Sequence, residues 1–162
     1  METIAVYWES RIKTYGFQRI TDLSLIELSY AISDTKSLGE LFSQDDLKTL
    51  KPKFILAQVT NHEISFIFCL PLEESKSLCR VLEETSHPIS YRYTHPVSIV
   101  FFHGPHFGDR YGIADATFSS LLKAGIKVLA SGCSLASVFL VLAAHDIDKA
   151  EEILAETFEV AK

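Results

Sequence analysis

The sequence predicts an α+β protein that is built from two copies of one small unit. Two kinds of segment follow each other along the chain. In one, apolar residues occupy every second position, as is typical of strands, and in the other they recur at helical spacing. The order strand-helix-strand-strand-helix-strand occurs once in full and a second time without its last strand, with matching elements roughly 75 residues apart. These two observations predict tandem units, each a sheet with helices on one face.

The first copy begins with an alternating, apolar-rich strand at residues 23–32. Its two middle strands are separated only by Asn61 and His62, which predicts a tight turn. Glu73 and Glu74 follow Pro71, a sequence typical of a helix start. In order, the further elements are two short helical patterns between residues 38 and 50, strands at residues 54–60 and 63–70, a helix from Pro71, and a strand at residues 89–93.

The second copy repeats this order but lacks the last strand. Gly125 is a suitable C-cap for its first helix, and Asp146 is a suitable N-cap for its second. Its elements are a strand at residues 97–103, a helix at residues 113–124, strands at residues 127–130 and 137–143, and a final helix from Asp146.

Residues 2–9 alternate like a strand and have no place in the first copy. We therefore expect them to supply the missing strand of the second copy, because an open sheet edge invites aggregation. The predicted architecture is α+β, ferredoxin-like βαββαβ, with a first unit at residues 10–95 and a second unit at residues 96–162 that strand 2–9 completes.

Composition excludes several classes of protein. The chain has 162 residues, 48% of them hydrophobic, and a formal net charge of −6, which argues against a nucleic-acid partner. Neither a signal peptide nor an apolar run of membrane-spanning length is expected. Cys69, Cys79 and Cys133 are scattered and suggest no disulfide framework, so we expect a cytoplasmic protein.

Two segments of the second copy resemble the ACT domain. Residues 108–118 (GDRYGIADATF) contain most of that family's Asp-x-Pro-Gly turn, with Tyr111 in place of the proline, and residues 123–128 (KAGIKV) match its entry to the second strand. Residues 131–138 (SGCSLASV) resemble the strand-turn-strand of the regulatory ACT pair of aspartokinases. The chain is similar to a free-standing regulatory half without a kinase portion.

The resemblance implies a non-catalytic sensor that binds an amino acid where a strand-helix loop faces a neighbouring unit, and that regulates a partner enzyme. We also expect a homodimer, because the apolar-rich sheet face opposite the helices needs a cover. The helix after Gly112 would favour a carboxylate, and Asp109 would take the ammonium. Alternatively, Gly112 only permits the turn and Asp109 caps the helix. The implied ligand-binding positions are Gly108, Asp109, Tyr111, Gly112, Ile113, Lys127, Val128, Leu129, Ser134 and Ser137, and in the first copy Ser33, Asp34, Thr35, Leu38 and Gly39.

Two other functions remain open. The run His103-x-x-His106-x-x-Asp109 has the residue types of a metal site, and a complete site would need a third or fourth ligand such as His62, His87, His95 or His145. A structural dimerisation module without ligand is the other. We expect no catalytic residues and no cofactor, since the sequence contains neither a nucleophile motif nor a phosphate-loop lysine.

Overall fold

The computed structural model describes residues 11–85, 89–105, 107–108, 110–134 and 136–160, and only the backbone of Asp34, Thr35, Ser37, Leu38 and Asp46. These residues form two compact units. The first unit comprises residues 20–98, and the second unit comprises residues 11–19 together with residues 99–160.

The helices and strands follow the predicted order closely. In chain order they are β1 (Lys13–Thr14), β2 (Phe17–Ala31), the 3₁₀ turn η1 (Ile32–Asp34), α1 (Thr35–Phe42), α2 (Asp45–Lys48), β3 (Phe54–Val59), β4 (Glu63–Pro71), α3 (Leu72–Glu84), β5 (Ser90–His103), α4 (Ile113–Lys123), β6 (Val128–Cys133), β7 (Ser137–Ala143), the 3₁₀ turn η2 (Ala144–Asp146), α5 (Ile147–Thr157) and β8 (Glu159–Val160).

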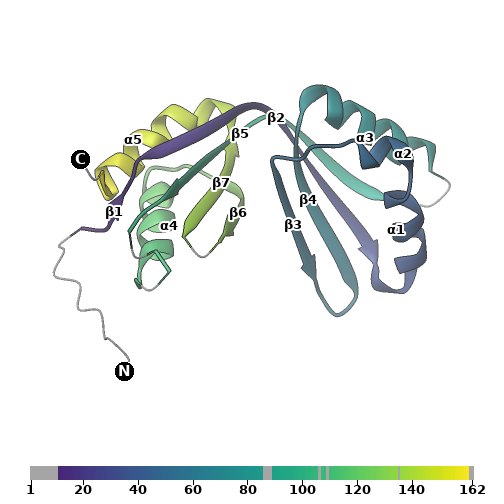
Figure 1. Ribbon diagram of the computed structural model, residues 1–162, viewed down its shortest axis with the longest axis horizontal. Helices are drawn as coiled ribbons and strands as arrows, with labels where there is room; N and C mark the ends of the chain where they lie inside the picture. Colours follow the sequence, from purple (N-terminus) through teal and green to yellow (C-terminus); the bar gives the residue numbers. More distant parts are fainter. Residues whose placement is uncertain (1–10, 86–88, 106, 109, 135, 161–162) are drawn as a thin grey trace. The chain divides into compact units, whose positions relative to one another are not determined.

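The first unit is an antiparallel sheet covered on one face by helices. Its strand order is β3-β4-β2-β5, and Figure 1 shows α1, α2 and α3 on one side of β3 and β4. Ile26, Leu28 and Tyr30 alternate along β2 and pack against apolar residues of β4 and of all three helices. This alternation is the period of two that the sequence displays.

The second unit has the same layers. Its strand order is β2-β5-β7-β6, and α4 and α5 lie on one side of β6 and β7 (Figure 1). Val100, Leu140 and Leu142 of the sheet pack against Leu121 of α4 and Leu154 of α5. Together the two units confirm the predicted α+β, ferredoxin-like fold.

β2 and β5 are each divided between the two units. The first residues of β2 belong to the second unit, where the ring of Phe17 lies 5.2 Å from that of Phe102 in β5. The first part of β5 belongs to the first unit and is its fourth strand. Residues 2–9, predicted to complete the second unit, lie outside the described residues, so their placement remains a prediction.

Two details differ from the sequence-based expectation. The separate strands predicted at residues 89–93 and 97–103 form one strand, β5, which continues through Pro96. The fixed φ of proline is compatible with extended backbone, although proline lacks an N–H. A two-residue strand, β8, follows α5 and pairs in parallel with β1. A strand that short has no periodicity to detect.

Membrane-spanning helices are not found in the described part of the chain: no helix there is both long and apolar enough to cross a bilayer.

Two neighbouring leucines of α4 provide a test of the second unit's core. Leu121 is fully buried, whereas Leu122 is 78% exposed. We expect Leu121→Ala to lower the free energy of unfolding by about 2–5 kcal/mol, because it leaves a cavity among packed residues. The same change at Leu122 should cost less than about 0.5 kcal/mol. Urea unfolding of both variants measures the difference, and equal losses would contradict this packing.

Candidate functional site

A pocket of about 250 Å³ opens at the start of α4 in the second unit. One wall is the turn that leads into this helix, and the other is the β6-β7 hairpin. Its lining residues are Phe107, Arg110, Tyr111, Gly112, Ile113, Ala114, Cys133, Ser134, Ser137 and Val138. We call this space the α4 pocket.

Gly112 shapes the first wall. Its φ of 88° is left-handed, a conformation that glycine adopts without strain and that lets the chain enter the helix abruptly. The carbonyl of Gly112 accepts the first helical hydrogen bond, from the N–H of Ala116 at 2.9 Å. The N–H groups of Ile113, Ala114 and Asp115 therefore have no partner within the helix, and they carry the positive end of its dipole.

The hairpin turn forms the second wall. The N–H of Ser134 donates to the carbonyl of Ser137 at 2.9 Å, and the N–H of Ser137 donates back at 3.4 Å. These two bonds close the turn directly after Cys133, which pairs with Val138. Hydroxyl groups, a thiol and an apolar side chain are thereby presented toward the start of α4.

The α4 pocket brings together five of the predicted ligand-binding residues, namely Tyr111, Gly112, Ile113, Ser134 and Ser137. Lys127, Val128 and Leu129 do not line it. Val128 begins β6 and Cys133 ends it, so about 16 Å separates the two at the usual rise per residue. Gly108 is exposed beside the pocket without lining it, and Asp109 lies outside the described residues.

The corresponding turn of the first unit is built differently. β2 passes through the short turn η1, which includes Ser33, directly into α1. Gly39 lies inside α1 rather than ahead of it, and a Cβ at this position would meet no other group. The side chains of Asp34, Thr35 and Leu38 are not among those described, so ligand binding there remains a prediction.

Residues 13–15 fix the base of the loop between β5 and α4. The Thr14 hydroxyl donates to the carbonyl of His103 at 2.7 Å, and the N–H of Tyr15 donates to the same oxygen at 2.9 Å. A Cβ on Gly104 would overlap the carbonyl oxygen of Lys13 and the ring of Phe107. The backbone of Lys13 thus approaches residue 104 so closely that only glycine, which has no side chain, fits there.

The proposed histidine metal site receives no support from the geometry that is described. The ring of His103 contacts the ring of Tyr15, with 5.3 Å between centroids. His106 lies outside the described residues, and within the described ranges no three His, Cys, Asp or Glu side chains are grouped to hold a metal ion. A site using His103 and His106 remains a prediction.

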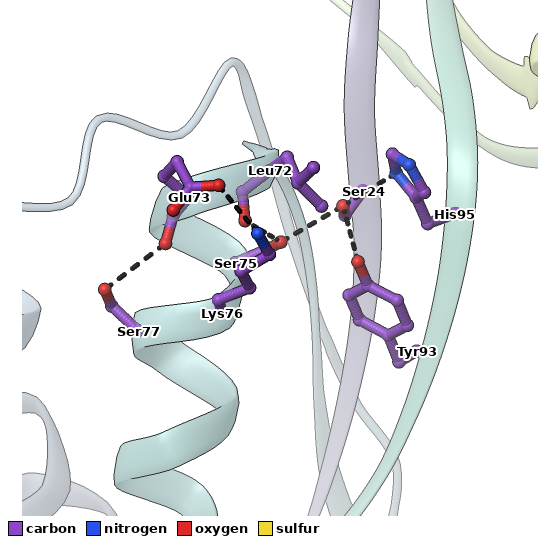
Figure 2. Close-up of polar contacts among 8 residues, drawn as sticks. All are labelled: Ser24, Leu72, Glu73, Ser75, Lys76, Ser77, Tyr93 and His95. Atoms are coloured by element: carbon purple, nitrogen blue, oxygen red, sulfur yellow. Dashed lines mark hydrogen bonds and ion pairs between the residues drawn. The ribbon is translucent and has the colours of Figure 1, made fainter.

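The first unit contains a serine-histidine contact that the sequence analysis did not predict. Figure 2 shows Ser24 of β2 between Ser75 of α3 and the side chains of Tyr93 and His95 on β5. The Ser24 hydroxyl oxygen lies 3.1 Å from Ser75 Oγ, 3.0 Å from Tyr93 Oη and 3.1 Å from His95 Nδ1.

This contact is structural and not a nucleophile with its base. Ser24 and Ser75 are fully buried, so a substrate cannot reach either hydroxyl. His95 Nδ1 also lies 3.2 Å from the carbonyl oxygen of Leu23, which only accepts, so Nδ1 carries the proton when that bond forms. A nitrogen that already carries a proton does not take one from serine.

The three cysteines provide a test of the site. Cys133 is exposed in the α4 pocket, whereas Cys69 is fully buried and burial raises its pKa to about 12. Burial, together with the Glu83 carboxylate, also raises the pKa of the half-buried Cys79. Because the thiolate is the reactive form, we expect Ellman's reagent at pH 8 to modify Cys133 quickly and Cys69 only after unfolding. Cys133→Ser should remove the fast phase, and a fast phase that persists would contradict the pocket geometry.

Comparison with known proteins relates the chain to others by structure alone. No protein-family model matches the sequence, and no curated protein matches it. Many solved structures are similar to the chain, and three examples cover most of it at low identity. The aspartokinase alpha and beta subunits have a TM-score of 0.74 and 15% identity, over 89% of this chain and 97% of that one.

The regulatory subunit of aspartate kinase from Thermus thermophilus, in its ligand-free form, has a TM-score of 0.71 and 15% identity, over 90% of this chain and 99% of that one. Aspartate kinase from Synechocystis has a TM-score of 0.76 and 16% identity, over 92% of this chain and 28% of that one. At the level of the fold, these structures confirm the predicted resemblance to the regulatory ACT pair of aspartokinases.

Proposed function

We propose that the chain is a non-catalytic regulatory module that binds an amino acid in the α4 pocket. The observation that carries this proposal is that one pocket brings together the first N–H groups of α4, which have no partner within the helix, and the Ser134–Ser137 turn. The fold, which is similar to that of aspartokinase regulatory subunits, supports it.

The lining of the α4 pocket suits a small carboxylate. The N-terminus of a helix attracts anions, and the guanidinium of Arg110 adds positive charge nearby. Ser134 and Ser137 offer hydroxyl groups for further hydrogen bonds. Phe107, Ile113 and Val138 would contact an apolar side chain. We propose Asp109, which lies outside the described residues, as the partner of the ligand's ammonium on the basis of the sequence alone.

The size of the pocket and one structural neighbour favour an amino acid. A volume of about 250 Å³ is below the roughly 300–1,000 Å³ of sites for drug-sized molecules, which favours a smaller ligand. E. coli aspartokinase III, a neighbour with a TM-score of 0.62 and 14% identity, was solved with lysine and aspartate. Amino acids are therefore the first ligands to test.

Regulation would follow from unequal affinity. A ligand shifts an equilibrium only by the difference between its affinities for the two states. We propose that the bound amino acid changes association between two copies of the chain, or between the chain and a partner enzyme, by favouring one arrangement of the β5-α4 loop.

A thermal-shift screen against the twenty amino acids tests the proposal. A ligand at about one hundred times its dissociation constant should add about 2.7 kcal/mol, enough to raise the melting temperature by several degrees. Ser134→Phe should abolish the shift by filling the pocket. Ala136→Phe, an exposed position in the same turn that does not line the pocket, is the matched control and should retain it.

Three outcomes would count against the amino-acid proposal. A complete absence of shifts would contradict it. A shift that survives Ser134→Phe would move the site elsewhere. A shift with divalent metals alone, lost on replacement of His103 and His106, would favour a metal-binding protein instead.

A further inference from the structure

A second pocket, of about 450 Å³, opens in the first unit and is lined by apolar side chains alone. These come from α1, α2, the segment after α2, and strands β3 and β4. The lining residues are Phe42, Leu47, Leu50, Pro52, Ile55, Phe66 and Phe68. We call this space the phenylalanine pocket.

Three aromatic rings give this pocket its walls. The ring of Phe42 lies 5.4 Å from that of Phe66 and 6.0 Å from that of Phe68, and the latter two stack at 6.0 Å. Phe68 is 7% exposed and Leu47 is 8% exposed, so both belong to the core of the unit, whereas Ile55 is 54% exposed. The pocket therefore runs from the core of the unit to an open mouth at β3.

The mouth exists because β3 extends beyond the cover of the short helices. Ile55 and Val59 pair with Phe68 and Ile64 of β4 and share a face of the sheet with them. α1 has 8 residues and α2 has 4, and both Ile55 and Val59 remain more than half exposed. An apolar opening of this kind on a protein surface marks a binding site more often than an ordinary surface does.

Lysines border the lining residues. Lys48, Lys51 and Lys53 are exposed and directly adjoin Leu47, Leu50 and Pro52 in the sequence. The Lys48 ammonium is paired with Asp45 at 2.7 Å. Three lysines within six residues are a local excess of positive charge in a chain with a net charge of −6.

The backbone of this lysine segment is held in place. The N–H of Lys51 donates to the Glu74 carboxylate at 2.6 Å, and the N–H of Lys53 donates to the carbonyl of Cys69 at 2.8 Å. Glu74 is thus an acidic group beside the segment, and its carboxylate is engaged by a backbone N–H. Lys51 and Lys53 are exposed residues on an anchored backbone and flank Pro52 of the pocket in the sequence.

We propose that the phenylalanine pocket binds an amphipathic small molecule with an apolar body and an anionic head, the chemistry of a medium-chain carboxylate. The alkyl chain lies among the three phenyl rings, and the carboxylate meets Lys51 and Lys53 at the mouth. The pocket volume falls within the roughly 300–1,000 Å³ typical of small-molecule sites. The site lies in the first unit and is independent of the α4 pocket.

Calorimetric titration of the unmodified protein with hexanoate, octanoate and decanoate, each below its micelle concentration, tests the proposal. Affinity should rise roughly fourfold for each added methylene, because each one is removed from water. Decanol should bind more weakly than decanoate, and Lys51→Gln with Lys53→Gln should remove that difference. Absence of binding, or affinity that does not depend on chain length, would overturn the proposal.

A matched pair of variants locates the site. Ile55→Trp should fill the mouth and weaken decanoate binding at least tenfold. Val59→Trp, on the same face of β3 but outside the pocket, should leave binding unchanged. Leu50→Trp provides a second blocking variant if Ile55→Trp does not fold, as judged by circular dichroism and melting. Equal binding by blocking and control variants would overturn the assignment.

Two further results distinguish this proposal from the amino-acid proposal and from a contact between two copies of the chain. Ser134→Phe, which fills the α4 pocket, should bind decanoate normally, so failure of the amino-acid proposal leaves this one standing. If decanoate does not bind and Ile55→Trp converts a dimer to a monomer in sedimentation experiments, the pocket is a contact between two copies of the chain, and the proposal is wrong.

Discussion

The second unit depends on the contact between residues 11–19 and the end of the chain. The rings of Phe17, Phe102 and Phe158 pack together, with centroids 5.1–6.4 Å apart. The guanidinium of Arg11 donates to the carbonyl oxygens of Glu156 and Phe158, and β1 pairs with β8. Aromatic packing and backbone pairing thus join the start of the described chain to its end.

The contact of residues 11–19 with the rest of the second unit also positions the loop that borders the α4 pocket. Phe107, which lines the pocket, meets Phe102 edge-to-face at 5.8 Å, and Thr14 and Tyr15 hold the carbonyl of His103. The close approach of Lys13 to Gly104 fixes the point at which the loop leaves β5. A segment nearly one hundred residues away in the sequence therefore positions the loop that borders the pocket.

Local patterns predicted the fold because each unit is built from short elements with clear periodicity. The two turns at the α4 pocket were predictable for the same reason. Gly112 lies in one short local motif, and Ser134 and Ser137 lie in another. The phenylalanine pocket was not predictable, because Phe42, Phe66 and Phe68 would have the same spacing in a filled core as in a core that contains a pocket. Whether an apolar residue meets another side chain or an opening depends on helix length and strand placement. The contact of Ser24 with His95 joins neighbouring strands of the sheet whose residues are 71 positions apart in the sequence, so it leaves no local signal.

The division of the chain between units affects the order in which they can fold during synthesis. The first unit is continuous, so all of its residues have been made once residue 98 is added. The second unit needs residues 11–19, which are made before the first unit, and α5 and β8, which are made after it. At about 5–20 residues per second, its first segment waits several seconds for its partners on the ribosome. The α4 pocket, which belongs to the second unit, is therefore completed later than the first unit.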